Sequence, residues 1–341
     1  MDVNDIIKNL KSLKDVEVEI GESREPKGWL STGLIALDWM VSNGRGLPLG
    51  KVAEIFGDSA SGKSYLAYRI IGTAQKKGFH TVLFDVEASY DKSFGAKCGV
   101  DNNNIIIVTG NTVEKIYSII DEMLDKIEGK FVFVWDSIAA TPTEKEMDDG
   151  MDVKDMTKAQ MIGKGMRMIT QKLDKTGSLL LVLNQLREKM DMFSRDKEFA
   201  PGGRSIEYHS SLNIELKRRG LVVEDKSVKG YKVHGVVTKN RVGVPFREVD
   251  IVMRWDREEF IPWHEGLLDI LIREGKVIDS SGWYRFYNDD KKWRASDFME
   301  MLYVKGDRLV SILEETFGSE CISQYIGSVE EKDTVEEKGD V

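Results

Sequence analysis

The chain has few of the residues that indicate a disulfide-bonded, zinc-binding or membrane-spanning protein. It contains two cysteines, Cys98 and Cys321, in 341 residues, and its four histidines have no zinc-type spacing. Its longest apolar runs, such as Leu179–Leu183, are far too short to cross a bilayer. Residues 1–20 alternate acids and lysines, which does not fit a signal or transit peptide. We therefore expect a globular protein of the reducing cytoplasm.

Acidic residues outnumber basic ones in this chain, with 58 Asp and Glu against 49 Lys and Arg. A net charge of −9 argues weakly against a protein coated all round with nucleic acid, but it leaves room for a local basic groove. Part of the acidity lies in the tail Ser328–Val341, where six acids outnumber two lysines. This tail is short of apolar residues, so we expect it to be disordered.

The hydrophobic pattern predicts an α/β fold. From Val52 to Gln185, apolar strand-like segments alternate with helical ones, which is typical of a mainly parallel sheet flanked by helices. Two further segments, Ser210–Lys217 and Tyr231–Thr238, read as paired strands. The strands expected in the alternating region are Val52–Phe56, Thr81–Asp85, Ile105–Val108, Phe131–Trp135 and Leu179–Leu183.

The same pattern suggests four parts. We expect an N-terminal helix and linker at 1–28, an α/β core at 29–261, a small C-terminal α+β domain at 262–327 and the acidic tail at 328–341. Two long loops interrupt the core, at 144–156 and 187–204, and long loops inside a compact domain are usually functional or disordered.

A glycine-rich loop carries the clearest chemical signal. Residues 57–64 read Gly-Asp-Ser-Ala-Ser-Gly-Lys-Ser, which fits the phosphate-loop pattern G-x-x-x-x-G-K-[ST]. The glycines let the backbone turn so that successive N–H groups face phosphate oxygens. Lys63 reaches the β- and γ-phosphates of ATP, and the Ser64 hydroxyl can ligate Mg²⁺. The residues expected to bind the nucleotide here are Gly57, Asp58, Ser59, Ala60, Ser61, Gly62, Lys63, Ser64 and Tyr65.

Two carboxylates are expected beside this loop. Asp136 ends a buried strand and would hold Mg²⁺ through water. Glu87 follows the strand that ends at Asp85, so it emerges at the same carboxyl edge of the sheet. There it can orient and deprotonate an attacking water. From position alone, a solvated loop acid remains the alternative for Glu87.

These residues resemble the RecA recombinase family, and the similarity runs from about Gly28 to Trp293. The runs Leu30–Asp38 and Gly46–Gly57 are similar to the family's entry into its phosphate loop. The resemblance implies a RecA-type ATPase core that forms helical filaments on single-stranded DNA and catalyses pairing and strand exchange with homologous double-stranded DNA. It also implies ATP and Mg²⁺ as cofactors, ATP at a head-to-tail subunit interface, and work alongside a single-strand binding protein and a loader.

The resemblance assigns further roles to individual residues. Glu87 is implied to be the catalytic glutamate, Ser137 to pair with Asp136, and Gln185 to sense the γ-phosphate. Adenine contacts are implied for Asp91 and Phe94. Both loops, 144–156 and 187–204, are implied to bind DNA. The individual DNA contacts implied, on the helix between the loops and on the second loop, are Arg167, Arg187, Lys189, Met190, Met192, Phe193, Gly202, Gly203 and Arg204.

A last segment resembles the part of the family that reaches the ATP of the neighbouring subunit. Lys239 and Arg241 would supply positive charge in trans, as an arginine finger does. Pro245 and Tyr208 fall at the same implied subunit boundary. Without the resemblance, a pair of solvated surface cations is the favoured interpretation of Lys239 and Arg241.

Some positions depart from the bacterial pattern. Gln160 and Asn213 stand where bacterial relatives carry basic residues, Glu207 stands in place of a lysine, and Arg241 replaces a lysine with a bidentate donor. The pattern is closest to the phage UvsX-like branch of the family. The segments that carry this closer resemblance are Met192–Ser194, Gly266–Asp269, Gly282–Tyr284 and Trp293–Ala295.

Two other functions remain open from the sequence. A ring helicase with the same core would also place ATP between subunits, although the N-terminal helix and small C-terminal domain favour an open filament. A recombination mediator could bind ATP without strand exchange, although a pure binding module has no need of a water-activating acid such as Glu87.

Overall fold

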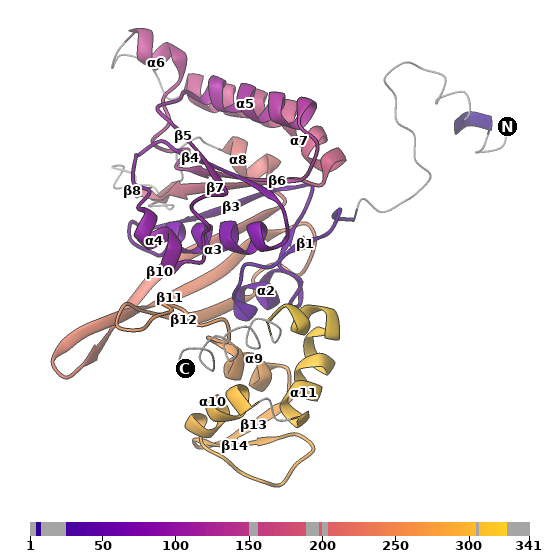
Figure 1. Cartoon of the computed structure of the whole chain (residues 1–341), viewed down its shortest axis with the longest axis vertical. Coiled ribbons are helices and arrows are strands. Elements are labelled where there is room, and N and C mark those ends of the chain that lie inside the picture. The colour runs from indigo at the N-terminus through magenta and orange to yellow at the C-terminus, as the bar shows by residue number, and fades with distance from the viewer. Residues whose placement is uncertain are drawn as a thin grey trace, which may run out of the picture.

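The alternating apolar segments form one eight-stranded sheet, with helices on both faces (Figure 1). The computed structural model describes residues 5–7, 25–149, 156–188, 198–199, 204–304 and 307–325. The order of strands in the sheet is β12-β11-β10-β3-β7-β6-β4-β5. The six strands from β10 to β5 run parallel, while β11 and β12 add to the edge in antiparallel fashion. The predicted α/β fold, a mainly parallel sheet flanked by helices, is confirmed.

The observed strands agree with the expected ones and extend several of them. The strands of the main sheet are β3 (Val52–Gly57), β4 (His80–Asp85), β5 (Ile105–Thr109), β6 (Phe131–Asp136), β7 (Leu179–Gln185), β10 (Leu212–Glu224), β11 (Ser227–Asn240) and β12 (Glu248–Arg254). Three small pairs complete the strands of the described chain: β1 (Trp29–Leu30) with β2 (Leu47–Pro48), β8 (Arg187–Glu188) with β9 (Glu198–Phe199), and β13 (Val277–Ser280) with β14 (Trp283–Phe286).

Helices lie on both faces of the sheet, and a further group of helices near the C-terminus lies apart from it (Figure 1). In the described chain they are α2 (Ile35–Ser42), α3 (Lys63–Lys76), α4 (Lys92–Lys97), α5 (Val113–Lys126), α6 (Glu144–Asp149), α7 (Met156–Thr176), α8 (Arg204–His209), α9 (Leu267–Arg273), α10 (Ala295–Val304) and α11 (Asp307–Phe317). Helices α5 and α7 cover one face, whereas α3 covers the other.

The central strands are buried on both faces, which explains why their sequences are continuously apolar. In β6, Phe131, Phe133 and Trp135 enter the core under α5 and α7. Val132 and Val134 of the same strand enter the opposite core, under α3. Successive side chains of a strand point to opposite faces, so a single apolar run serves both cores.

Part of the first predicted loop is helical, which corrects the prediction for that segment. Residues 144–149 of the segment 144–156 form helix α6, with the backbone N–H of Thr143 donating to Glu146 Oε2 at 2.6 Å. The segment 187–204 begins and nearly ends in the paired strands β8 and β9, and its last residue begins α8. Because acids stabilise the first turn of a helix, the acid-rich run that suggested a loop is suited to a helix start. The remaining residues of both segments lie outside the described chain.

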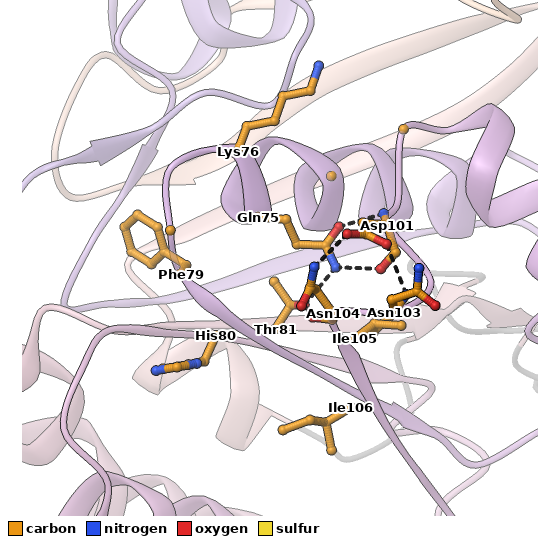
Figure 2. A pocket seen from close by; sticks show the side chains of 13 residues that line it. Gln75, Lys76, Phe79, His80, Thr81, Asp101, Asn103, Asn104, Ile105 and Ile106 are labelled. Carbon is orange, nitrogen blue, oxygen red and sulfur yellow. Dashed lines mark hydrogen bonds between the residues drawn. The ribbon is translucent and has the colours of Figure 1, made fainter.

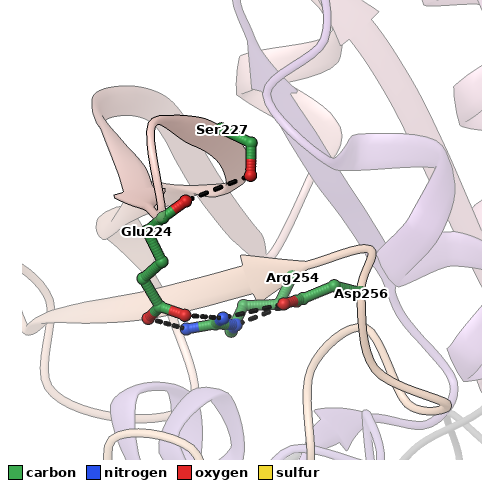
Figure 3. Close-up of polar contacts among 4 residues, drawn as sticks. All are labelled: Glu224, Ser227, Arg254 and Asp256. Carbon is green, nitrogen blue, oxygen red and sulfur yellow. Dashed lines mark hydrogen bonds and ion pairs between the residues drawn. The ribbon is translucent and has the colours of Figure 1, made fainter.

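The long hairpin of β10 and β11 projects beyond the sheet (Figure 1). Arg254, the last residue of β12, contacts the end of strand β10 in this hairpin. Its guanidinium donates to both carboxylate oxygens of Glu224 at 2.6 and 2.7 Å and also forms an ion pair with Asp256 (Figure 3). The bidentate geometry suits the planar guanidinium, and the ion pairs lower the pKa of both carboxyls. At the tip, the Ser227 hydroxyl donates to the Glu224 carbonyl at 3.0 Å.

The C-terminal elements pack on the α2 side of the core. Phe298, Leu313 and Phe317 belong to the same buried cluster as α2 and α3. Tyr325 stacks on Trp263 at 5.3 Å. The proposed division at residue 262 stays a prediction, and so does the N-terminal helix, of which the structure describes only residues 5–7. Within the described chain, none of the helices has the length and apolar character needed to span a bilayer.

A buried carboxyl joins distant parts of the chain. Asp38 is fully buried and accepts hydrogen bonds from the Ser31 hydroxyl at 2.6 Å and from the Thr32 hydroxyl at 2.7 Å. The Tyr325 hydroxyl donates to the same carboxyl. Burial raises the pKa of Asp38, while these hydrogen bonds act in the opposite direction. A buried carboxylate needs hydrogen-bond donors. Because Tyr325 is one of these donors, the cluster links the C-terminal end of the described chain to α2.

Candidate active site

The phosphate loop connects β3 to α3 at the carboxyl edge of the sheet. Gly57 has φ +151° and lies so close to the Leu216 carbonyl of β10 that a Cβ would collide with it. Gly62 caps α3 with φ +94°, a conformation that side chains rarely adopt. The helix therefore begins directly after the loop, and its positive N-terminal end faces the space that the loop encloses. This strand-loop-helix context is the one that the motif requires.

Lys63 lies within this loop. Its Nζ donates to the carbonyl of Gly57 at 3.0 Å and to that of Asp58 at 2.5 Å. Burial lowers the pKa of Lys63, and the nearby carboxylates of Asp136 and Glu87 counteract this. A buried ammonium surrounded by acceptors and carboxylates is a strong attachment point for an anionic phosphate.

The two predicted magnesium ligands are brought together. The Ser64 hydroxyl on α3 donates to Asp136 Oδ2 at the end of β6, at 3.0 Å. Burial raises the pKa of Asp136 to about 6, and the repulsion of Glu87 and Asp85 adds to this. A hydroxyl beside a crowded, buried carboxyl forms a donor set suited to a hard cation that keeps several of its own waters. Among the described residues, no cluster of three or more His, Cys, Asp or Glu could hold a metal by itself.

Glu87 lies next to this pair. Its Oε1 accepts a hydrogen bond from the Ser137 hydroxyl at 2.7 Å and one from Gln185 Nε2 at 3.5 Å. Asp85, which the sequence analysis did not single out, accepts from the backbone N–H groups of Ser89 and Tyr90 and so holds the turn after Glu87. Glu87, Ser137 and Gln185 therefore meet although they follow three different strands, β4, β6 and β7.

The residues expected near adenine lie at the start of α4, and their contact with adenine stays a prediction. Asp91 caps α4 by accepting from the Phe94 backbone N–H at 2.7 Å. The Phe94 ring is half-buried and packs against Phe260 at 5.7 Å and Tyr68 at 5.9 Å. Tyr65 is buried in the same aromatic cluster, with its hydroxyl near the Ile261 carbonyl. Tyr65 could therefore meet a nucleotide only through its backbone.

The remaining cations form a second cluster around α8. The Nζ of Lys239 donates to the Glu207 carbonyl, and Arg241 Nη2 donates to the Tyr208 carbonyl at 3.1 Å. Burial and the charge of Arg241 lower the pKa of Lys239. Tyr208 is 62% exposed, and Pro245 is half-buried. The two predicted trans cations thus lie together, and the charges acting on them differ from those acting on Lys63.

The DNA-contact predictions are only partly described. Arg167 is exposed on α7, and its charge acts on His209 together with those of Lys239 and Arg241. The backbones of Arg187 and Arg204 lie in β8 and α8. The predicted contacts that lie outside the described residues are Lys189, Met190, Met192, Phe193, Gly202 and Gly203.

A buried carboxyl that the sequence analysis did not assign joins the two clusters. Glu54 of β3 is 3% exposed and accepts from Asn184 Nδ2 at 3.0 Å and from Asn213 Nδ2 at 2.6 Å. Burial raises its pKa to about 7. A signal was present, because Glu54 is an acid inside the apolar strand Val52–Gly57, but strand order was needed to identify its partners.

A cavity of about 660 Å³ lies elsewhere on the molecule (Figure 2). Its walls include His80 and Ile105, the first residues of β4 and β5, together with Gln75, Phe79 and Asn104. Because the strands run parallel, this cavity lies at the opposite end of the sheet from Gly57, Glu87 and Asp136, so it plays no part in the phosphate site.

The chain was also compared with known proteins. The family model described as the RecA N-terminal domain matches residues 8–258. The protein RecA of Rhodopirellula baltica is 32% identical over 275 residues, which are 79% of this chain and 72% of that protein. The protein RecA of Aquifex aeolicus is 29% identical over 307 residues, 90% of this chain and 85% of the other. The protein RecA of Wolbachia sp. subsp. Brugia malayi is 28% identical over 310 residues, with coverage of 91% and 84%.

Proposed function

Because this chain belongs to the RecA family of DNA-dependent ATPases, we propose that it forms helical filaments on single-stranded DNA and catalyses homologous pairing and strand exchange. The observation that supports this proposal is that the ends of β3, β4, β6 and β7 meet beside the phosphate loop. There Ser64 contacts Asp136, and Glu87 contacts Ser137 and Gln185. A protein that only bound ATP would have no use for Glu87 in this position.

The fit of ATP and Mg²⁺ can be judged from the residues present. The close approach of Gly57 to β10 leaves no room for a side chain, so the loop backbone is free to face phosphate oxygens. Lys63 would hold the β- and γ-phosphates, and Ser64 with Asp136 would hold Mg²⁺. When bound, Mg²⁺ neutralises charge on the phosphate oxygens.

The side chains divide the remaining work of hydrolysis. Glu87 can accept a proton at a carboxylate oxygen from a water that attacks the γ-phosphorus, while the bond to the β-phosphate oxygen breaks. Ser137 and Gln185 orient Glu87 by donating to its Oε1. Gln185 then reports the presence of the γ-phosphate to the loop that follows it. Lys239 and Arg241 would meet the γ-phosphate of the next subunit and stabilise its developing charge.

Finer features of the proposal come from the sequence. The segments that resemble the phage UvsX-like branch support a place in that branch and in the cytoplasm of a bacterium or a phage-infected host. A single-strand binding protein and a loader are its proposed partners, together with single-stranded and homologous duplex DNA. The exposed side chain of Arg167 on α7 supports a DNA contact on this side of the molecule.

Two measurements test this function. ATP turnover should rise when single-stranded DNA is added, and the protein with ATP should then exchange a labelled single strand into a homologous duplex. Lys63→Ala is the matched control, because it removes the phosphate contact without touching the DNA side. DNA-stimulated turnover without strand exchange would favour a mediator, and rings rather than filaments in electron micrographs would favour a helicase.

A further inference from the structure

Glu54 occupies an unusual position for a carboxyl group. It lies in the middle of β3, between the neighbouring strands β7 and β10, and is almost fully buried. Each of its oxygens accepts one amide hydrogen bond, Oε1 from Asn184 and Oε2 from Asn213. Burying an ionised group is costly unless it is fully hydrogen-bonded, so the carboxylate depends on both amides.

The two amides cannot turn around. Asn184 uses its Oδ1 to accept the backbone N–H of Gln185 at 3.0 Å. Asn213 uses its Oδ1 to bond the Ser210 hydroxyl. In each case the amide oxygen is engaged, so the NH₂ group must face Glu54. A carboxylate accepts both hydrogen bonds without a donor of its own, whereas a protonated carboxyl or a glutamine brings a donor against one of the two donating NH₂ groups.

The two amides lead to different halves of the proposed ATPase. Asn184 is followed directly by Gln185, whose side chain contacts Glu87 at 3.5 Å. Asn213 pairs in register with Lys239 across β10 and β11. Ser210, which bonds Asn213, is held by the Ile206 carbonyl of α8, the helix whose carbonyls bond Lys239 and Arg241.

We propose that Glu54 is a positioning residue that couples the γ-phosphate sensor Gln185 to the cations Lys239 and Arg241 that act on the next subunit. This inference rests on the proposed function. Through Asn184 and Asn213, the carboxylate sets the separation of β7 and β10 at the level of the sensor. A change at Gln185 then reaches α8 through a continuous chain of buried hydrogen bonds.

The charged groups around Glu54 predict how the coupling depends on pH. Glu207 on α8 and Lys239 on β11 act on it with opposite signs, while burial is the largest effect and raises the pKa of Glu54 to about 7. Below this pH, the proton on Glu54 places a donor against one of the two donating amides and weakens that contact, so DNA-stimulated turnover should fall as the pH drops through 7. His209, the nearest histidine on α8, has a lowered pKa because of burial and of the surrounding cations, so it should titrate at lower pH.

Three variants test the coupling. Glu54→Gln keeps the shape of the side chain but places its NH₂ against one of the two amides. The double variant Glu54→Gln, Asn213→Asp restores every partner, because the carboxylate introduced at position 213 would accept from the new amide and still accept from Ser210. Glu215→Gln is the control, since Glu215 lies on the same strand β10 but pairs with Lys217 outside this network.

The expected pattern separates positioning from folding. Glu54→Gln should keep a thermal midpoint close to that of wild type and a monomer dissociation constant for ATP within about twofold, because removing a buried charge also removes its desolvation cost. Its DNA-stimulated kcat should fall about tenfold to hundredfold with little change in KM, and the pH dependence near 7 should vanish. The double variant should regain turnover to within about threefold, and Glu215→Gln should match wild type.

Other results would overturn the coupling. A Glu54→Gln protein with wild-type DNA-stimulated turnover and an unchanged pH profile would show that Glu54 is only a buried strand residue. If that protein does not fold, the double variant still decides, because turnover more than about tenfold below wild type would refute the proposed hydrogen-bond pattern. A wild-type protein without DNA-stimulated hydrolysis would instead refute the proposed function itself, and this inference with it.

Discussion

The division of the ATPase between two subunits can be tested by mixing two inactive variants. One variant carries Lys239→Ala and Arg241→Ala, and the other carries Lys63→Ala. Within one chain, the charges that act on Lys63 come from Asp136, Asp58 and Glu87, whereas those that act on Lys239 come from Arg241, Glu207 and Glu54. The two clusters are separate in charge, which is what a site shared between subunits requires.

The loss of the cations should affect catalysis far more than folding. Arg241 is exposed and donates to one carbonyl, so removing it should change the unfolding free energy by about 1 kcal/mol or less. Lys239 is half-buried with a lowered pKa, so its removal also relieves a desolvation cost. A positive charge supplied by a neighbouring subunit to the transferring phosphoryl group raises the rate of hydrolysis by about 10³–10⁵. The variant should therefore fold and bind ATP as a monomer, but lose DNA-stimulated hydrolysis.

Mixing should restore a definite part of the activity. A site is complete when its phosphate loop comes from the cation variant and its cations come from a Lys63→Ala neighbour. With equal amounts in random order along a head-to-tail filament, this holds at about one interface in four, so about a quarter of the wild-type rate should return. Phosphate release is measured as the mixing ratio is varied, and the maximum should lie at equal amounts.

The refuting result is equally definite. Mixtures that are shown to co-assemble, for example by energy transfer between labelled variants, and that still recover no activity would mean that Lys239 and Arg241 act within their own subunit or not at all. Each variant mixed with itself at the same total concentration is the control.

Three further predictions concern single residues. Lys63→Ala should lower ATP turnover by about 10²–10³, and phosphate release within tenfold of wild type would contradict the phosphate-loop assignment. Glu87→Gln should leave ATP binding and filament formation intact while hydrolysis falls by about 10²–10⁴; normal hydrolysis would mean that another group positions the water. Tyr325→Phe leaves Asp38 with one donor fewer, so the unfolding free energy in urea should fall by about 1–3 kcal/mol. Tyr287→Phe, whose hydroxyl meets Glu315 at the surface, is its control, and equal effects of the two would refute the role of the Asp38 cluster.

Features with a short repeat or a local motif could be predicted from the sequence. The five expected strands of the alternating region all form, because apolar runs of this length between helical segments have few other ways to be buried. The phosphate loop could be located because its two glycines are hard to replace. A side chain at Gly57 would collide with a neighbouring carbonyl, and Gly62 has a positive φ that side chains rarely adopt. The positions of Glu87 and Asp136 at the carboxyl edge of the sheet could also be predicted, because neighbouring parallel strands end at the same edge.

Local patterns failed where a residue had two plausible uses. The acid-rich segment after residue 143 was taken for a loop, but residues 144–149 form a helix whose first turn favours acids. The sequence of this segment was compatible with a loop and with a helix. The adenine contact implied for Asp91 stays a prediction, and in the structure its carboxylate also caps α4, as short polar side chains do readily.

The sequence by itself determined the phosphate loop, the alternation of strands and helices, and two acids of the site, Glu87 just after β4 and Asp136 at the end of β6. Only the tertiary structure decided which distant groups meet. Glu54, Asn184 and Asn213 are far apart along the chain, and they converge because β3 lies between β7 and β10 in a particular register. Spacing along a chain follows from local geometry, whereas contacts across a sheet depend on strand order, which is set by the packing of the whole domain.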